Sequence, residues 1–139
     1  MRKILLSTKI LVFLIISANL LLAGVTLQYF AAKPMGDGIL IEWRTGDESG
    51  TAKIEIERSA SAPDNFSFIK SVNATGNNSY YSFLDNSLSG FARSSGTIYY
   101  YRLKFFNSNG TYTYSNSISV VHSISGIKNT WGSIKAIFR

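Results

Sequence analysis

The chain of 139 residues contains no cysteine, one histidine and two prolines. Without cysteine it can form no disulfide, bind no metal through thiolates and carry no lipid on an N-terminal cysteine. The single histidine, His122, follows the last expected strand, so we expect a solvated linker residue there and no metal cluster. A hydrophobic core must therefore stabilise the folded chain, and the length suits one domain with such a core.

The chain also lacks the motifs of common catalytic sites, since neither a glycine-rich phosphate-binding loop nor a nucleophile elbow occurs in it. Glu55 and Glu57 could imitate paired catalytic carboxylates, but their alternation along "KIEIER" favours a charge ladder on a strand. Asp47 and Glu48 in "GDESG" could bind Ca²⁺ with nearby carbonyls, although two adjacent acids favour a plain solvated turn. The sequence predicts a protein that is not an enzyme and has no cofactor.

The net charge of +6 comes from the two ends of the chain. Three basic residues lie before residue 10, and three more lie after residue 127. Residues 25–127 contain eight basic and eight acidic residues, so the globular part is neutral. A nucleic-acid-binding protein needs a basic stripe that neutralises phosphates, and this part has none. We therefore expect no nucleic acid partner.

The N-terminus has the layout of a secretory signal. A basic start, Met1–Lys3, precedes the apolar run Ile10–Leu22, and the small residues "AG" follow. The run is short for a membrane span, which needs about 20 apolar residues. Cleavage after Ala23 would place Leu21 where a small residue is preferred, so residues 1–24 are either a signal peptide or an uncleaved anchor. We expect a periplasmic, cell-surface or extracellular protein that touches a membrane only if this segment is retained.

Seven short segments of the following chain show the period-two alternation of β-strands. Clusters rich in Gly, Asn, Asp, Ser and Pro separate them, among them "TGDESG" and "NATGNNS". The pattern predicts an all-β, seven-stranded antiparallel sandwich over residues 25–121, with residues 122–139 as a linker and short basic tail. The expected strands are residues 25–32, 39–43, 53–58, 66–72, 80–84, 98–106 and 112–121.

Three stretches resemble a fibronectin type III domain: "ILIEWRTGDESGTAKIEIERS", "YYSFLDN" and "SGTIYYYRLKFFNSNGTYTYS". Gly96, Thr97 and Tyr99 fit the Gly-Thr-x-Tyr turn of that family, which leads into an alternating, tyrosine-rich strand. More narrowly, the stretches are similar to bacterial modules that stand beside C-terminal sorting domains in secreted surface proteins. The resemblance implies an immunoglobulin-like sandwich in which the third and sixth strands are neighbours. It also implies the roles of such modules, which are spacers, adhesion surfaces and receptor-binding units.

The expected strand at residues 98–106 turns one face to the core, because successive side chains of a strand point to opposite sides. The inward set is Tyr99, Tyr101, Leu103 and Phe105. We expect these residues to pack against the apolar side chains of other strands: Ile41, Trp43, Ile54, Ile56 and Phe83. The tyrosines of "YYY" then have a mostly structural role.

The opposite face of the same strand points to solvent. Its residues are Tyr100, Arg102, Lys104 and Phe106. Glu55 and Glu57 should face Arg102 and Lys104 across the sheet, with all four side chains exposed. Tyr100 and Phe106 remain as candidates for an exposed contact with a partner.

The loop Ser87–Gly96 is the longest candidate for a protruding contact, with Phe91 and Arg93 at its tip. The same loop could be a plain crossover between the fifth and sixth strands, in which Leu88 plugs the core.

The last twelve residues, "KNTWGSIKAIFR", follow the expected domain and are basic. Thr130 could cap a short helix with an apolar face. A helix of this length is unstable alone, so that face needs a surface to lie on. The segment is either a docking or sorting tail or a cover over an open end of the sandwich. Its candidate contact residues are Trp131, Ile134, Lys135, Phe138 and Arg139.

These observations favour an exported, non-catalytic interaction or adhesion module of a bacterial envelope or surface. The expected partner is a protein or a surface glycan. Two alternatives stay open, namely a carbohydrate-binding module that uses exposed rings such as Tyr100, Phe106 or Tyr112, and an accessory domain or inhibitor of a secreted enzyme. A row of coplanar exposed rings would favour carbohydrate binding.

Overall fold

The computed structural model describes residues 24–88 and 96–123. The expected signal segment, apart from Gly24, lies outside these residues. So do the loop candidates Phe91 and Arg93. The tail candidates also lie outside them: Trp131, Ile134, Lys135, Phe138 and Arg139.

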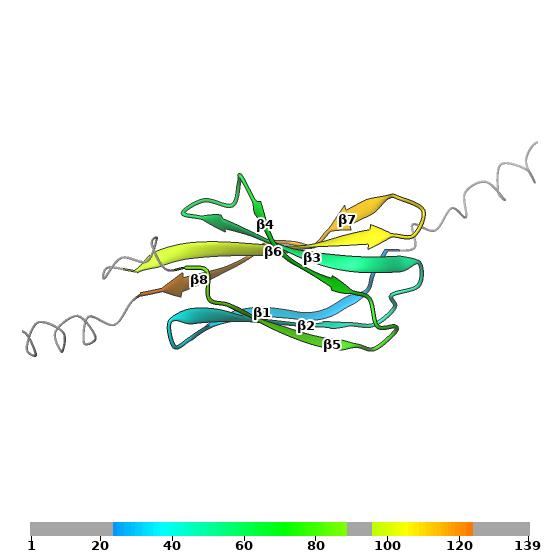
Figure 1. Ribbon diagram of the computed structural model, residues 1–139, viewed down its shortest axis with the longest axis horizontal. Coiled ribbons are helices and arrows are strands. Elements are labelled where there is room, and N and C mark those ends of the chain that lie inside the picture. The colour runs from blue at the N-terminus through cyan, green and yellow to red at the C-terminus, as the bar shows by residue number, and fades with distance from the viewer. Residues whose placement is uncertain (1–23, 89–95, 124–139) are drawn as a thin grey trace, which may run out of the picture.

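Strands are the only regular elements of the described chain, and they pack as two antiparallel sheets face to face (Figure 1). The predicted all-β sandwich is therefore confirmed. The strands are β1 Leu27–Met35, β2 Gly38–Thr45, β3 Thr51–Ala60, β4 Ser67–Asn73, β5 Tyr80–Asp85, β6 Thr97–Asn107, β7 Tyr112–Tyr114 and β8 Ile118–His122.

The structure has eight strands in the described residues, and the prediction of seven was wrong. The expected last strand, residues 112–121, is divided into β7 and β8, which both pair with β6. Ser115 lies in the gap, where its backbone N–H donates to Leu103 O at 2.9 Å and its hydroxyl accepts from Leu103 N at 2.9 Å. Because a side-chain oxygen replaces a backbone carbonyl opposite Leu103, the regular ladder is interrupted there.

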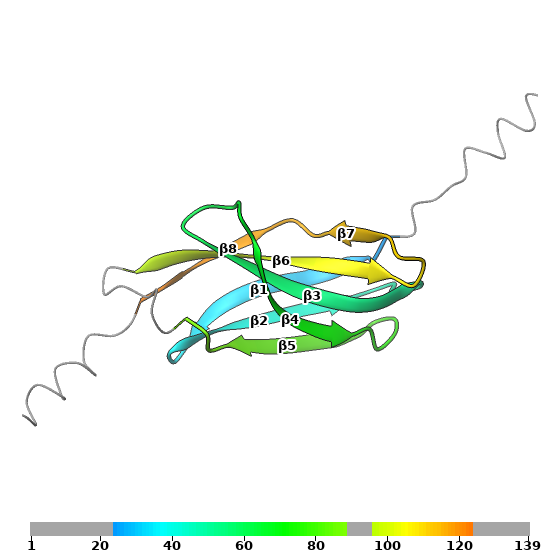
Figure 2. The ribbon, with the colours of Figure 1, turned by 45° about the horizontal axis from the view of Figure 1, so that its top comes forward.

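The smaller sheet has the order β1-β2-β5, and the larger has the order β4-β3-β6-β7, with β8 also beside β6 (Figure 2). The expected third and sixth strands, now β3 and β6, are indeed neighbours. Their register pairs Ile54 with Phe105 and Ile56 with Leu103. This arrangement leaves β4 and β5 as outer strands of the two sheets.

The core lies between the sheets and contains the residues expected there. Trp43, Ile54, Ile56, Tyr101 and Leu103 are fully buried. Because a slip of one residue would send this set to solvent, the predicted register is confirmed. The other buried apolar residues are Ile39, Ile41, Leu88, Tyr99, Phe105 and Val120, with Phe83 packed against them.

Leu88 is only 1 % exposed. It fills part of the core, as we expected if the loop is a plain crossover.

His122 is not a solvated linker residue, contrary to expectation. It is the last residue of β8 and is 1 % exposed. The alternation of β8 explains this, since His122 follows Val120 on the inward side. Neither ring nitrogen has a hydrogen-bond partner among the described residues.

Candidate binding surfaces

The outer face of the larger sheet gathers aromatic rings and cations from four separate segments. We name this surface the cation–aromatic face. Arg102, Lys104 and Phe106 belong to it through the outward side of β6. The register places Tyr114 opposite Lys104 and Tyr112 opposite Phe106. Its members are Lys53, Phe66, Arg102, Lys104, Phe106, Tyr112 and Tyr114.

Each cation of this face lies against at least one ring. The ammonium of Lys104 is 4.3 Å from the ring centroid of Tyr112 and 4.6 Å from that of Phe106. The guanidinium of Arg102 is 4.0 Å from Tyr114 and 4.2 Å from Phe66. These distances are those of cation–π contacts, which orient both partners.

The charges on this face differ from the expected ladder in one pair. Arg102 Nε donates to Glu57 Oε2 at 2.7 Å, as expected. Glu55 stands opposite Lys104 in the register, but its carboxylate accepts from Lys53 Nζ at 2.6 Å. Lys104 forms no ion pair with a carboxylate in the described part of the chain, because the rings hold its ammonium instead.

The expectation that all four charged side chains are exposed was also wrong. Glu57 is buried, with 8 % exposure, and Glu55, Arg102 and Lys104 are half-buried. The Arg102 guanidinium, itself flanked by two rings, covers the Glu57 carboxylate. A register shift between Ile56 and Glu57 accompanies this arrangement.

The rings of this face are gathered but not coplanar. Phe106 and Tyr112 are tilted by 49° with centroids 5.8 Å apart, and Tyr112 and Tyr114 meet edge to face at 74°. Tyr112 is 52 % exposed and Tyr114 is 43 % exposed. The coplanar row that would favour a flat polysaccharide platform is therefore not formed by these three rings.

Of the two contact candidates on β6, Phe106 takes part in these contacts, as does the candidate ring Tyr112. Tyr100 points to the same side of β6 and is half-buried. It lies two residues from Arg102, roughly 7 Å along the strand, but takes part in none of the cation–ring contacts between described residues. Phe66 and Arg102 were not recognised as contact residues. The pattern "YTY", which sends Tyr112 and Tyr114 to one side, was the signal available in the sequence.

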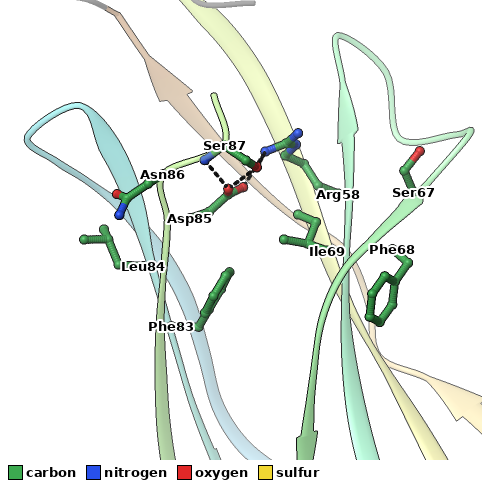
Figure 3. A pocket seen from close by; sticks show the side chains of 9 residues that line it. All are labelled: Arg58, Ser67, Phe68, Ile69, Phe83, Leu84, Asp85, Asn86 and Ser87. Carbon is green, nitrogen blue, oxygen red and sulfur yellow. Dashed lines mark hydrogen bonds and ion pairs between the residues drawn. The ribbon is translucent and has the colours of Figure 1, made fainter. Parts of the chain in front are cut away.

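A second surface is a pocket at the open side of the sandwich, between the outer strands β4 and β5 (Figure 3). We name it the edge pocket. Its volume is about 420 Å³. Its lining residues are Arg58, Ser67, Phe68, Ile69, Phe83, Leu84, Asp85, Asn86 and Ser87.

A buried carboxylate organises the polar side of the edge pocket. Asp85 is 1 % exposed, and its Oδ1 accepts from the backbone N–H and the hydroxyl of Ser87 at 3.0 and 2.6 Å. Its Oδ2 accepts from Arg58 Nη1 at 2.6 Å and from the Tyr101 hydroxyl at 2.9 Å. Four donors fill the acceptor capacity of a carboxylate, so Asp85 is a structural anion and not a free base.

The titration of this cluster follows from the same contacts. Burial opposes the charged form of Asp85, but hydrogen bonds from Ser87 and Tyr101 and the Arg58 charge outweigh it and lower the pKa of the carboxyl. Burial, together with the nearby Asp85 charge, raises the pKa of Tyr101. Both groups therefore keep their ordinary charge states at neutral pH.

The turn that contains Asp47 and Glu48 has a structural role. Glu48 is 4 % exposed, so it is not part of a plain solvated turn. Its carboxylate accepts from Thr45 Oγ1 at 2.6 Å, from the Tyr81 hydroxyl at 2.8 Å and from Gly76 N at 2.9 Å. It ties the β2–β3 turn to the β4–β5 loop. The described residues contain no cluster of three or more metal-ligating side chains.

The outer face of the smaller sheet carries two exposed tyrosines. Tyr80 donates its hydroxyl to Glu42, which also forms an ion pair with Lys33 at 2.6 Å. Tyr29 is 47 % exposed. Tyr29 lines a pocket together with Tyr114 of the cation–aromatic face. Tyr80, which is 59 % exposed and lies on the opposite sheet, is therefore the matched control for the tyrosines of that face.

Comparison with known proteins gives a fold relationship. No protein-family model matches the chain, and no curated protein matches it. Pectate lyase PelI from Erwinia chrysanthemi, in a complex with tetragalacturonic acid, aligns over 70 % of this chain and 28 % of its own, with 23 % identity and a TM-score of 0.51. OgpA from Akkermansia muciniphila, with an O-glycopeptide substrate, aligns over 73 % of this chain and 30 % of its own, with 14 % identity and a TM-score of 0.55.

The chain thus corresponds to less than a third of each of these larger proteins. In the ranges 24–88 and 96–123, no helix has the length and hydropathy needed to cross a membrane.

Proposed function

We propose that this protein is an exported, non-catalytic interaction module that binds a protein partner through the cation–aromatic face. The observation that carries the proposal is the assembly of half-buried cations and rings with the exposed Tyr112 and Tyr114 on one side of a sheet. These residues come from segments that are separate in the sequence. Tyr and Arg are the residues that dominate binding energy at protein interfaces. The ammonium of Lys104, which has no carboxylate partner in the described part, favours an acidic contact on the partner.

The absence of catalysis is part of the proposal and rests on the state of the three buried acids among the described residues. One of them, Glu57, accepts from Arg102 Nε at 2.7 Å. The carboxylate oxygens of Asp85 and of Glu48 all accept hydrogen bonds from within the domain. A general base needs a free lone pair within reach of a substrate proton. Export is supported by the signal-like layout of residues 1–24. The sheet orders β1-β2-β5 and β4-β3-β6-β7 support the fibronectin type III resemblance.

The test places a photo-crosslinking benzoylphenylalanine at position 112 in the producing cells, with position 80 as the matched control. We expect a discrete crosslinked species from position 112 that excess unlabelled protein abolishes and that position 80 does not give. Excess protein carrying Tyr112→Ala and Tyr114→Ala should fail to compete. Equal crosslinking from both positions, or full competition by the double variant, would contradict the proposal.

A carbohydrate-binding module is the second candidate. The observation that favours it is the fold relationship to pectate lyase PelI and OgpA, whose complexes hold an oligogalacturonate and an O-glycopeptide. The ammonium of Lys104, which has no carboxylate partner in the described part, would attract an acidic sugar chain more strongly than a neutral one. Electrophoresis in gels with polygalacturonate or with a neutral galactan tests this. Retardation in the polygalacturonate gel that Lys104→Gln removes would select this candidate over the protein partner.

An accessory domain or inhibitor of a secreted enzyme is also compatible with this fold relationship. The tip of its expected contact loop Ser87–Gly96, with Phe91 and Arg93, lies outside the described residues.

A further inference from the structure

The edge pocket has the size and mixed lining of a small-ligand site and does not belong to the cation–aromatic face. Its volume of about 420 Å³ lies within the usual range of such sites. Figure 3 shows Phe83 of β5 and Ile69 of β4 on opposite sides of the gap, with Arg58 between the strands. The pocket therefore combines apolar walls with a polar end.

The polar end offers the donors of Arg58 and, at the rim, the mixed donors and acceptors of Ser67 and Asn86. In its hydrogen bonds with described residues Arg58 uses Nη1, for Asp85 Oδ2 at 2.6 Å and Ser87 Oγ at 2.9 Å. Its guanidinium carbon also lies 5.7 Å from the ring centroid of Tyr99. A guanidinium has five N–H groups, so those of Nη2 and Nε remain for a ligand. The Arg58 side chain is 17 % exposed, which leaves it accessible from the pocket. The Asp85 carboxylate is filled by its four donors and cannot accept from a ligand.

The charge of this end is balanced, because the Asp85 carboxylate lies 2.6 Å from the Arg58 guanidinium. A free anion would be attracted by Arg58 and repelled by Asp85 at almost the same distance. A fitting ligand is neutral, carries oxygen acceptors in a fixed spacing and has an apolar face for Phe83 and Ile69. A pyranose ring has all three properties.

We propose that the edge pocket binds a single neutral pyranose residue. The ring hydroxyl oxygens accept from Nη2 and Nε of Arg58, and the C–H face of the sugar lies on Phe83. Ser67 and Asn86 at the rim add polar groups for further hydroxyls. For a ligand of this size in an open pocket, the dissociation constant should be on the order of 1 mM.

Nuclear magnetic resonance of the ¹⁵N-labelled protein, as the producing cell exports it, tests the proposal directly. The probes are D-galactose, D-glucose, D-galacturonate and acetate, each titrated to about 50 mM, well above the expected constant. We expect a neutral sugar to shift the Arg58 Nε–H signal and the backbone signals of Ile69 and Phe83. Shifts with galacturonate and acetate alone would overturn the proposal, as would no shift at all. Shifts confined to Tyr112 and Tyr114 would assign sugar binding to the other face.

Two conservative variants separate binding from folding. Arg58→Lys keeps the positive charge beside Asp85 but loses the planar set of donors. Phe83→Leu keeps an apolar wall but loses the ring. Each should weaken sugar binding by about threefold to tenfold, the value of one good ring contact or hydrogen bond. Tyr29→Ala is the control and should leave binding unchanged.

Leu84→Ala replaces Phe83→Leu if the latter does not fold, because Leu84 is exposed and borders the same pocket. Unchanged affinity in Arg58→Lys and in the folded wall variant would overturn the proposal. If the edge pocket binds no sugar, the crosslinking test at position 112 is unaffected, since that test concerns the cation–aromatic face.

Discussion

Asp85→Ala should be among the most destabilising single substitutions in this domain. Asp85 of β5 joins the smaller sheet to Arg58 of β3 and Tyr101 of β6 in the larger sheet. Its removal leaves the Arg58 charge, 17 % exposed, without its carboxylate and leaves the buried Tyr101 hydroxyl without its acceptor. Breaking a buried ion pair in this way costs about 3–5 kcal/mol. Since the free energy of unfolding of such domains is about 5–15 kcal/mol in total, the variant should be close to unfolding.

Urea unfolding followed by far-ultraviolet circular dichroism measures this cost. The control is the double variant Asp85→Leu with Arg58→Met, which replaces the pair by apolar side chains. It should lose less stability than Asp85→Ala, because no charge is left unpaired. A loss below about 1 kcal/mol in Asp85→Ala would refute the reasoning, because that is the range of an exposed ion pair.

The same carboxylate predicts how stability depends on pH. The folded state lowers the pKa of Asp85, so its stabilising contribution is complete above the ordinary value of about 3.9. It is lost as the pH falls through the lower folded value, because the unfolded state binds the proton more tightly. Asp85→Asn should therefore flatten the acid limb of the stability curve. An unchanged acid limb would show that other carboxylates govern it.

Three further substitutions test other parts of the structure. Glu48→Ala removes the acceptor of three hydrogen bonds and should cost about 2–3 kcal/mol, while added Ca²⁺ leaves the melting temperature of the native protein unchanged. Gly38→Ala should destabilise the domain by about 1–3 kcal/mol, because a Cβ there would lie 2.7 Å from Asp85 O and from Asn86 Oδ1. Arg102→Ala should cost about 1–3 kcal/mol by leaving Glu57 buried without its ion pair, and Glu57→Gln in the same chain should recover part of the loss. Calorimetry measures all three, and a loss below about 0.5 kcal/mol in any of them would contradict the corresponding contact.

The alternation of apolar and polar residues in the sequence was sufficient to predict which side chains form the core. Alternation along β3 and β6 identified Ile54, Ile56, Tyr101 and Leu103 as core, and each is fully buried. This worked because a strand has a strict period of two, and burial of one face penalises any other register. The zero net charge of residues 25–127 also followed from the sequence alone.

Only the tertiary structure decided which polar and aromatic side chains meet. Glu48 and Tyr81 are 33 residues apart and still share a hydrogen bond, and Arg58 reaches Asp85 across 27 residues. The division of the last strand likewise depends on a hydroxyl of Ser115 that replaces a carbonyl opposite Leu103. Such contacts depend on distances between strands that are remote in the chain, and the pattern of apolar and polar residues carries no information on them. The sequence by itself therefore determined the sandwich and its buried face, while the cation–aromatic face and the edge pocket arose from the packing of strands that only the folded chain brings together.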